Sequence, residues 1–291
     1  MTGEIEIYEL GVAATVFVFG CIIGSFLNVC IYRLPRGLSV LRPGRSFCPR
    51  CRTSIVWQDN IPLVSFLLLR GRCRWCGCLI SWRYFIVEGL TGLLLAALYL
   101  AQGAASGVDP GQVVIMGLLT TLLIVASAVD MDFLIIPDEL SVYGLAGGLL
   151  AGLLLPPLHV GGQPWHTFAS GTGLPASAIG AVVGGGIVLI AAVVGALIFR
   201  KEAMGLGDAK LMAMVGAFMG WKVAFAAFLV APFFGLLYGV PLLIRKKEHV
   251  MPYGPFLSMA TVLVMLARPA FCGYITLAQE TVREVIGYLM R

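Results

Sequence analysis

The chain has 291 residues, of which 59% are hydrophobic and only 12% are charged, and its mean hydropathy is +0.94. Soluble domains carry about 25% charged residues, so this composition excludes an ordinary soluble domain and predicts an all-α polytopic membrane protein. The 36 glycines fit membrane helices that pack closely through small side chains. The distribution of charged residues along the chain is more informative about topology than the net charge of +5.

The first apolar segment, residues 10–32, predicts a membrane-spanning helix, and residues 1–32 form the first division of the chain. Acidic residues precede this segment where a cleavable signal peptide would carry basic ones, so we expect it to be retained. The segment contains Asn28. A polar amide within a membrane helix more often bonds a neighbouring helix than a substrate.

Residues 33–83 interrupt the apolar pattern with a strongly basic segment. They hold ten of the twenty basic residues of the chain, all arginine, and one acid, Asp59. Short basic loops stay on the cytoplasmic side, so we expect a cytoplasmic insert and an N-terminus on the outside. Anionic lipid head groups are a secondary candidate partner for this charge, whereas nucleic acid is not expected for so small an insert.

The insert carries two Cys-x-x-Cys pairs, Cys48 with Cys51 and Cys73 with Cys76. Four thiolates presented by two tight turns predict a tetrahedral zinc site. Such a site has no open coordination position, so its zinc would be structural. Two disulfides or redox-active pairs are the alternative, and a reducing cytoplasm disfavours them. A fifth thiol, Cys78, lies outside the pattern and has no assigned role.

The third division, residues 84–271, predicts a run of further membrane spans and brings the total to about eight. They cover residues 84–101, 112–129, 140–155, 177–199, 211–220, 223–244 and 256–271. The sixth span of the chain, 211–220, is short: with its flanks it reaches about 20 Å, which suits a thin or re-entrant segment. Residues 272–291 form a mixed tail expected in the membrane interface.

Glu88 falls near the start of the second span. We expect it in the first turn of that helix, where a carboxylate interacts favourably with the helix dipole. A role in binding substrate is the equal alternative.

Two acidic residues reach the same membrane edge in this topology. Asp130 closes the span 112–129, and Asp208 precedes the short span 211–220. A carboxylate at the edge of a membrane span is costly and marks a candidate functional site. Two neighbouring carboxylates do not both ionise cheaply, so one keeps a proton and the other can activate water. Asp132 and Asp138 are local rivals of Asp130, and a solvated face or a helix cap is the expected role of each.

The order of the motifs resembles that of the bacterial type IV prepilin peptidases, which are membrane aspartic proteases with a Gly-x-Gly-Asp motif. The matching segments are Gly24-Ser25-Phe26-Leu27-Asn28-Val29, the two cysteine pairs, Asn60-Ile61-Pro62, Asp130-x-Asp132 with Pro137-Asp138, Gly205-x-Gly207-Asp208-x-Lys210 and Pro252-Tyr253-Gly254-Pro255. Each motif is weak alone, but their order along the chain is specific.

The resemblance implies that Asp130 and Asp208 are catalytic, and it favours Asp130 over Asp132 because Asp130 lies seven residues before Pro137. It also implies the substrates, which are leaders of type IV prepilins or type II secretion pseudopilins. These are cut after Gly, before a usually aromatic residue, at the cytoplasmic face of the bacterial inner membrane. Many members then methylate the new N-terminus with S-adenosylmethionine, at a site that the sequence does not locate.

Two other classes of function compete with a peptidase. An ion-coupled transporter would use the acids to line an ion path and would distribute them through the depth of the membrane. The acids here gather at one edge, which favours the peptidase. A non-catalytic assembly platform would instead use the zinc insert to dock a partner.

Overall fold

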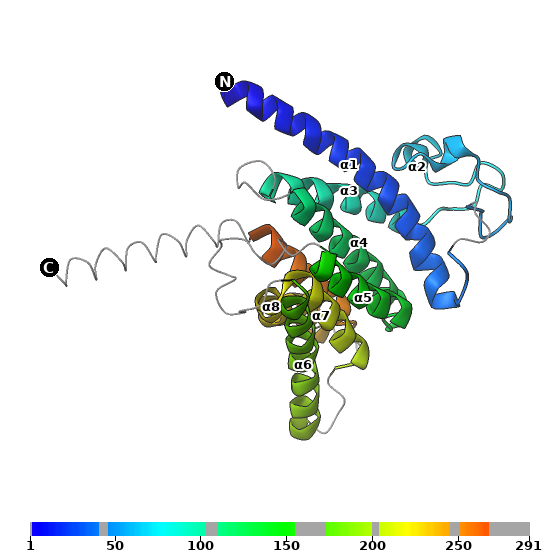
Figure 1. Cartoon of the computed structure of the whole chain (residues 1–291). Helices are drawn as coiled ribbons and strands as arrows, with labels where there is room; N and C mark the ends of the chain where they lie inside the picture. Colours follow the sequence, from blue (N-terminus) through cyan, green and yellow to red (C-terminus); the bar gives the residue numbers. More distant parts are fainter. Residues whose placement is uncertain are drawn as a thin grey trace.

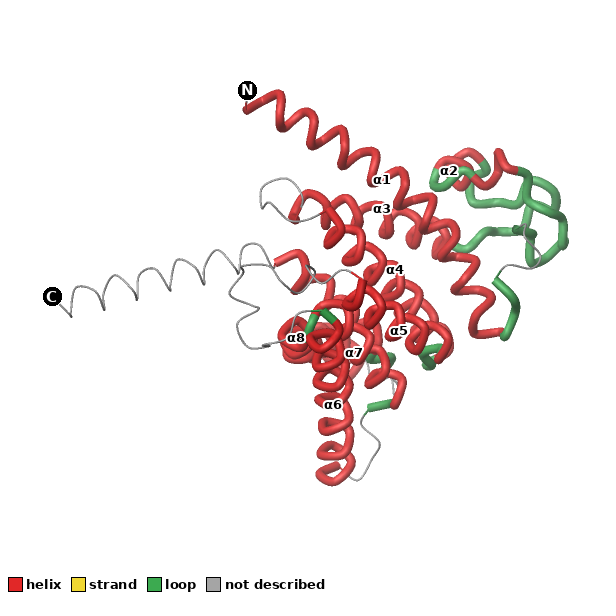
Figure 2. The backbone as a smooth tube through the Cα atoms, viewed as in Figure 1, coloured by secondary structure: helices red, strands yellow, loops and turns green. Residues whose placement is uncertain are grey.

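The structure is a computed structural model that describes residues 2–40, 46–102, 110–154, 173–199, 204–244 and 251–267. These residues form helices joined by short loops (Figure 1). The α-helices are α1 (Thr2–Arg33), α2 (Val64–Leu68), α3 (Trp82–Gln102), α4 (Pro110–Phe133), α5 (Asp138–Leu154), α6 (Leu174–Phe199), α7 (Leu206–Met219), α8 (Trp221–Ile244) and the unlabelled Gly254–Ala267. Two isolated bridges in the insert are the only β pairing in the described residues, and Figure 2 shows the insert as mainly loop.

The prediction of an all-α membrane protein with about eight membrane helices is confirmed. Five helices, α1, α3, α4, α6 and α8, are long and apolar enough to cross a membrane. Three shorter helices complete the set: α5 has 17 residues, α7 has 14, and the apolar helix Gly254–Ala267 is the last. The tail 272–291 lies outside the described residues, so its expected place in the interface stays a prediction.

The short helix α7 is the centre of the bundle. It packs against α5, α6 and α8, and Leu211, Met212, Met214 and Val215 are fully buried. A helix of 14 residues is about 20 Å long, less than the hydrocarbon thickness of about 30 Å. Because protein surrounds α7, it does not need to match the lipid itself. Exposed apolar side chains lie instead on α6 and α8, for example Val182, Leu197 and Leu237.

Helices α1 and α3 form a close pair that carries the insert between them (Figure 1). A Cβ on Gly20 would lie 2.6 Å from the Cα of Gly92, and a Cβ on Gly24 would lie 2.7 Å from the Cα of Glu88. Only glycine permits so close an approach, the usual role of small residues four apart in membrane helices. The Asn28 side-chain amide donates to the Tyr84 carbonyl oxygen at 3.1 Å, so this residue does join two helices as predicted.

Candidate active site and candidate metal centre

Asp130 lies in the last turn of α4 and is buried. The helix ends at Phe133, and Leu134 then adopts a left-handed conformation with φ of 55° while its N–H bonds the Asp130 carbonyl oxygen at 2.8 Å. The carboxylate Oδ2 accepts a hydrogen bond of 2.9 Å from the backbone N–H of Gly254. This N–H belongs to the first residue of the helix Gly254–Ala267.

Asp208 also bonds a backbone N–H at the start of a helix, in this case its own helix α7. It is the third residue of α7, and its Oδ2 accepts from the backbone N–H of Gly205, the N-cap, at 3.3 Å. Each aspartate thus contacts the N-terminus of a membrane helix, where the unpaired N–H groups and the helix dipole stabilise negative charge. The two helices bring this stabilisation to the same edge of the bundle.

Ile136 joins the two helix starts. A Cβ on Gly207 would lie 3.3 Å from the Ile136 Cβ, and a Cβ on Gly254 would lie 3.3 Å from its Cδ1. Asp130 and Asp208 interact electrostatically across this junction. Tyr253 lies near Asp208, and burial together with the charge of Asp208 raises the pKa of this phenol to about 12. Tyr253 therefore keeps its proton at neutral pH, and its phenol lies within electrostatic range of Asp208.

The rival aspartates form ion pairs. Asp132 pairs with Arg83 at the start of α3, and Asp138 pairs with Lys210 of α7 at 2.6 Å. Both carboxylates are exposed. Among the described residues no ion pair is formed by Asp130 or Asp208. The prediction that Asp132 and Asp138 have surface roles therefore agrees with the geometry, and Asp130 and Asp208 stay the candidates for catalysis.

The contact between Gly254 and Asp130 gives a first mutational prediction. A Cβ on Gly254 would lie 2.8 Å from Asp130 Oδ2, so Gly254→Ala must displace the carboxylate. A misplacement of about 1 Å costs up to about a hundredfold in rate, and we expect a loss of about tenfold to a hundredfold in any reaction that Asp130 catalyses. The control is Gly235→Ala, whose new Cβ would meet Phe256 at an ordinary 3.7 Å. Equal reaction rates for the two purified variants would contradict a catalytic position for Asp130.

The insert gathers thiols as the sequence predicts, although not in the predicted set of four. The sulfur atoms of Cys48, Cys73, Cys76 and Cys78 all lie within 4.8 Å of one another. The Cys48 sulfur is 3.9 Å from that of Cys76 and 3.6 Å from that of Cys78. A tetrahedral zinc with bonds of about 2.3 Å separates its sulfur ligands by about 3.8 Å, so the cluster fits a zinc ion.

Cys51, one of the four predicted ligands, lies outside this closest group. Its thiol still interacts with the thiols of Cys48 and Cys76, and it bonds Thr53. The backbone N–H groups of Cys51 and, to a smaller degree, Arg50 lower the pKa of the Cys48 thiol to about 6. This favours the thiolate that a zinc ion requires.

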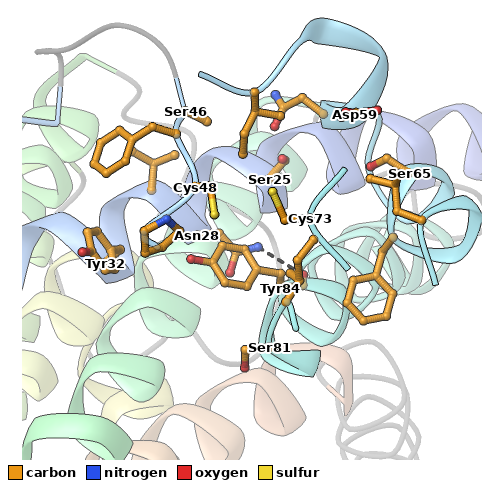
Figure 3. A pocket seen from close by; sticks show the side chains of 18 of the residues that line it. Ser25, Asn28, Tyr32, Ser46, Cys48, Asp59, Ser65, Cys73, Ser81 and Tyr84 are labelled. Carbon is orange, nitrogen blue, oxygen red and sulfur yellow. Dashed lines mark hydrogen bonds between the residues drawn. The ribbon is translucent and has the colours of Figure 1, made fainter. Parts of the chain in front are cut away.

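A cavity of about 420 Å³ lies where α1, α3 and the insert meet. Figure 3 shows Asn28 of α1, Tyr84 of α3 and Cys48 and Cys73 of the insert around it. Two buried polar atoms of its lining, Asn28 Oδ1 and Arg83 Nε, have no hydrogen-bond partner. Buried polar groups are normally satisfied, so these two atoms are available to bond a polar ligand.

Glu88 also lines this cavity, and its predicted position in the first turn of a helix is wrong. Helix α3 begins at Trp82, earlier than the hydropathy pattern indicates, so Glu88 lies in the second turn. Its Oε2 accepts a hydrogen bond of 2.8 Å from the backbone N–H of Leu63 in the insert, and it also bonds Ser25 of α1. Leu63 has a φ of 60°. Glu88 therefore ties the insert to both helices.

Comparisons with known proteins agree with this architecture. Residues 18–102 match the family described as the bacterial peptidase A24 N-terminal domain, and residues 117–240 match the type IV leader peptidase family. A protein of Aeromonas salmonicida named prepilin leader peptidase/N-methyltransferase is 35% identical over 279 residues, covering 86% of this chain and 89% of the relative. The chain belongs to the type IV leader peptidase family.

Two other relatives with the same name extend this comparison. The Bacillus subtilis protein is 32% identical over 253 residues, covering 86% of this chain and 92% of the relative. The Myxococcus xanthus protein is 39% identical over 233 residues, covering 80% of this chain and 63% of the relative. None of the solved structures gives a significant match.

Sequence reasoning missed some features of this leader peptidase family member. The contact of Gly254 with Asp130 and the position of Tyr253 are two of them, although the motif Pro252-Tyr253-Gly254-Pro255 marked the segment. The place of Cys78 among the thiols is a third. The only signal for it was a fifth cysteine close to a recognised pair.

Proposed function

We propose that this membrane protein is an aspartic endopeptidase that removes the leaders of type IV prepilins or pseudopilins, with Asp130 and Asp208 as its catalytic pair. The observation that carries the proposal is the electrostatic interaction between the buried Asp130 and the half-buried Asp208, each bonded to a backbone N–H at the start of a membrane helix. The names of the relatives support the substrate class.

The proposed mechanism follows from two carboxylates that share one proton. The ionised carboxylate takes a proton from a water molecule, which attacks the scissile peptide carbon, while the protonated carboxyl polarises the carbonyl oxygen. The N–H groups of Gly254 and Gly205 each hold one carboxylate oxygen and so orient the pair. Such a pair titrates as a unit, with two apparent pKa values that belong to both groups.

The site also fits a substrate that spans the membrane. The positive charge of the insert supports a cytoplasmic position for this edge and an N-terminus on the outside, and the bacterial relatives support a location in the inner membrane. The resemblance implies cleavage at the cytoplasmic membrane face, which would be this same edge. Whether the substrate serves a pilus or a secretion system does not alter this chemistry.

A cleavage assay tests the function directly. The full-length protein in detergent or liposomes would be incubated with a prepilin that has a Gly–Phe junction, and mass spectrometry would identify the new N-terminus. We expect cleavage after the Gly. If several prepilins and pseudopilins all stay intact while the protein is folded, the peptidase proposal is wrong.

The second proposed activity is methylation of the new N-terminal amine, as the names of the relatives indicate. S-adenosylmethionine supplies an activated methyl group on a sulfonium cation. We assign it to the cavity between α1, α3 and the insert, where Glu88 offers a negative charge and Asn28 Oδ1 and Arg83 Nε lack partners. Arg83 also pairs with Asp132, two residues from Asp130, so the cavity adjoins the proposed peptidase site.

A substitution at Glu88 tests this location. Glu88→Gln keeps an oxygen that can accept from the Leu63 N–H but removes the negative charge that faces the cavity. Hydrogen bonds to charged groups contribute about 1.5–3 kcal/mol, so we expect binding of S-adenosylmethionine to weaken by about tenfold or more. Leader cleavage should change little.

The affinity is measured by isothermal titration calorimetry on the purified protein. Glu139→Gln, an exposed acid at the start of α5, is the control. Unchanged affinity in Glu88→Gln would place the methyl donor elsewhere, whatever the cleavage rate.

A further inference from the structure

The two cysteine turns of the insert are built alike. In the first turn the Cys48 N–H bonds the Thr53 carbonyl oxygen at 3.0 Å, and in the second the Cys73 N–H bonds the Cys78 carbonyl oxygen at 2.8 Å. Each turn is closed by an isolated bridge, Phe47–Ser54 in the first and Arg72–Leu79 in the second. Within the first turn the Arg52 N–H bonds the Cys48 carbonyl oxygen, and within the second the Gly77 N–H bonds the Cys73 carbonyl oxygen, both at 2.9 Å. Arg52 and Gly77 also share a positive φ.

This correspondence gives Cys78 a defined place. Cys48 matches Cys73, Cys51 matches Cys76, and Cys78 stands where the first turn has Thr53. The second turn therefore presents three thiols where the first presents two thiols and a hydroxyl.

Cys78 meets the distance requirement of a ligand, and Cys51 is its natural competitor. The Cys78 sulfur lies 3.6 Å from that of Cys48, within the group of four mutually close thiols. Cys51 lies outside that group and bonds Thr53, yet it interacts with the thiols of Cys48 and Cys76. A tetrahedral zinc takes four sulfur ligands, and five thiols surround this position.

We propose that Cys78 and Cys51 alternate as the fourth ligand of the zinc, while Cys48, Cys73 and Cys76 are permanent ligands. In either arrangement one thiol stays beside a complete coordination shell, so the metal can exchange one ligand without leaving the site. The proposal rests on the zinc site and is independent of the assignment of the peptidase aspartates.

Metal analysis of single and double variants tests the exchange. The full-length protein would be purified in detergent under reducing conditions, and its zinc content determined by mass spectrometry. We expect about one zinc per chain in the wild type, in Cys51→Ser and in Cys78→Ser, and none in Cys51→Ser/Cys78→Ser. The single variant Cys48→Ser should lose its zinc. Cys21→Ser is the control and should keep its zinc, because Cys21 lies in α1, outside the insert.

Three outcomes would overturn the proposal. Loss of zinc from Cys51→Ser alone means that Cys78 cannot serve, and loss from Cys78→Ser alone means that Cys51 cannot. Retention by the double variant means that neither is needed. Cobalt substitution gives a second readout, because both single variants should keep the absorption spectrum of a four-thiolate site. A three-thiolate spectrum in either one would also contradict the exchange.

Discussion

Replacing Asp208 with Asn is expected to lower the rate of leader cleavage by about a hundredfold to ten-thousandfold, the range that a general acid or base contributes. Asn keeps an oxygen that can accept from the Gly205 N–H, so the start of α7 should stay folded. It does not take a proton from water, and it cannot share one with Asp130. The change therefore removes the chemistry while preserving the shape of the site.

Three further variants make this prediction specific. Asp130→Asn should match Asp208→Asn, and the double variant should be little worse than either, because residues that act as a unit are not additive. Asp132→Asn is the matched control two residues away, since it loses only an exposed ion pair with Arg83. Normal cleavage by Asp208→Asn, measured by mass spectrometry of the released N-terminus, would rule out the proposed pair.

The same variants separate the competing functions. A transporter predicts ion flux in liposomes that the aspartate variants abolish. An assembly platform predicts that these variants keep their function while cysteine variants lose it. Asp130 and Asp208 each bond a backbone N–H at the same edge of the bundle. That arrangement suits a pair of groups acting on one substrate better than a path across the membrane.

The sequence predicted what depends on local composition and spacing. The hydropathy pattern and the basic insert placed Asp130 and Asp208 at one edge, and Lys210 of α7 does pair with Asp138 of α5 there. The spacing of the cysteines predicted a cluster of thiols, which the structure contains. Both results follow from short-range sequence patterns that do not depend on how the helices pack against one another.

Features that depend on tertiary packing were not predictable in the same way. The partner of Asp130 is the N–H of Gly254, 124 residues away, and no local pattern links them. The prediction put Glu88 in a first helical turn because it took the start of the apolar segment, residue 84, as the start of the helix. Helix α3 begins earlier, at Trp82, so Glu88 lies one turn further along. The short α7 is stable because its neighbours cover it, which a hydropathy profile of the single segment does not reveal.

The largest structural effect is expected from loss of the zinc. Cys73→Ser removes a permanent ligand, and structural zinc sites contribute about 10–16 kcal/mol of apparent binding free energy to their folds. The insert has little regular structure of its own: its described residues form one short α-helix, a 3-10 helix at Trp57–Asn60 and two isolated bridges. Besides the metal it is held by the ion pair between Asp59 and Arg74, the bond from Leu63 to Glu88 and the packing of Phe66 against Trp82 and Phe85. We therefore expect residues 46–80 to unfold locally while the membrane helices persist.

Hydrogen exchange read by mass spectrometry tests this expectation. Amides of residues 46–80 should exchange at least about a hundredfold faster in Cys73→Ser, and those of α4 and α7 should be unchanged. Because the insert supplies one wall of the cavity, binding of S-adenosylmethionine should be lost with it. Cys30→Ser, a thiol change in α1, should show none of these effects. Full protection of the insert in Cys73→Ser would show that packing against α1 and α3 holds it without metal, and that the bond between Glu88 and Leu63 contributes more than the zinc.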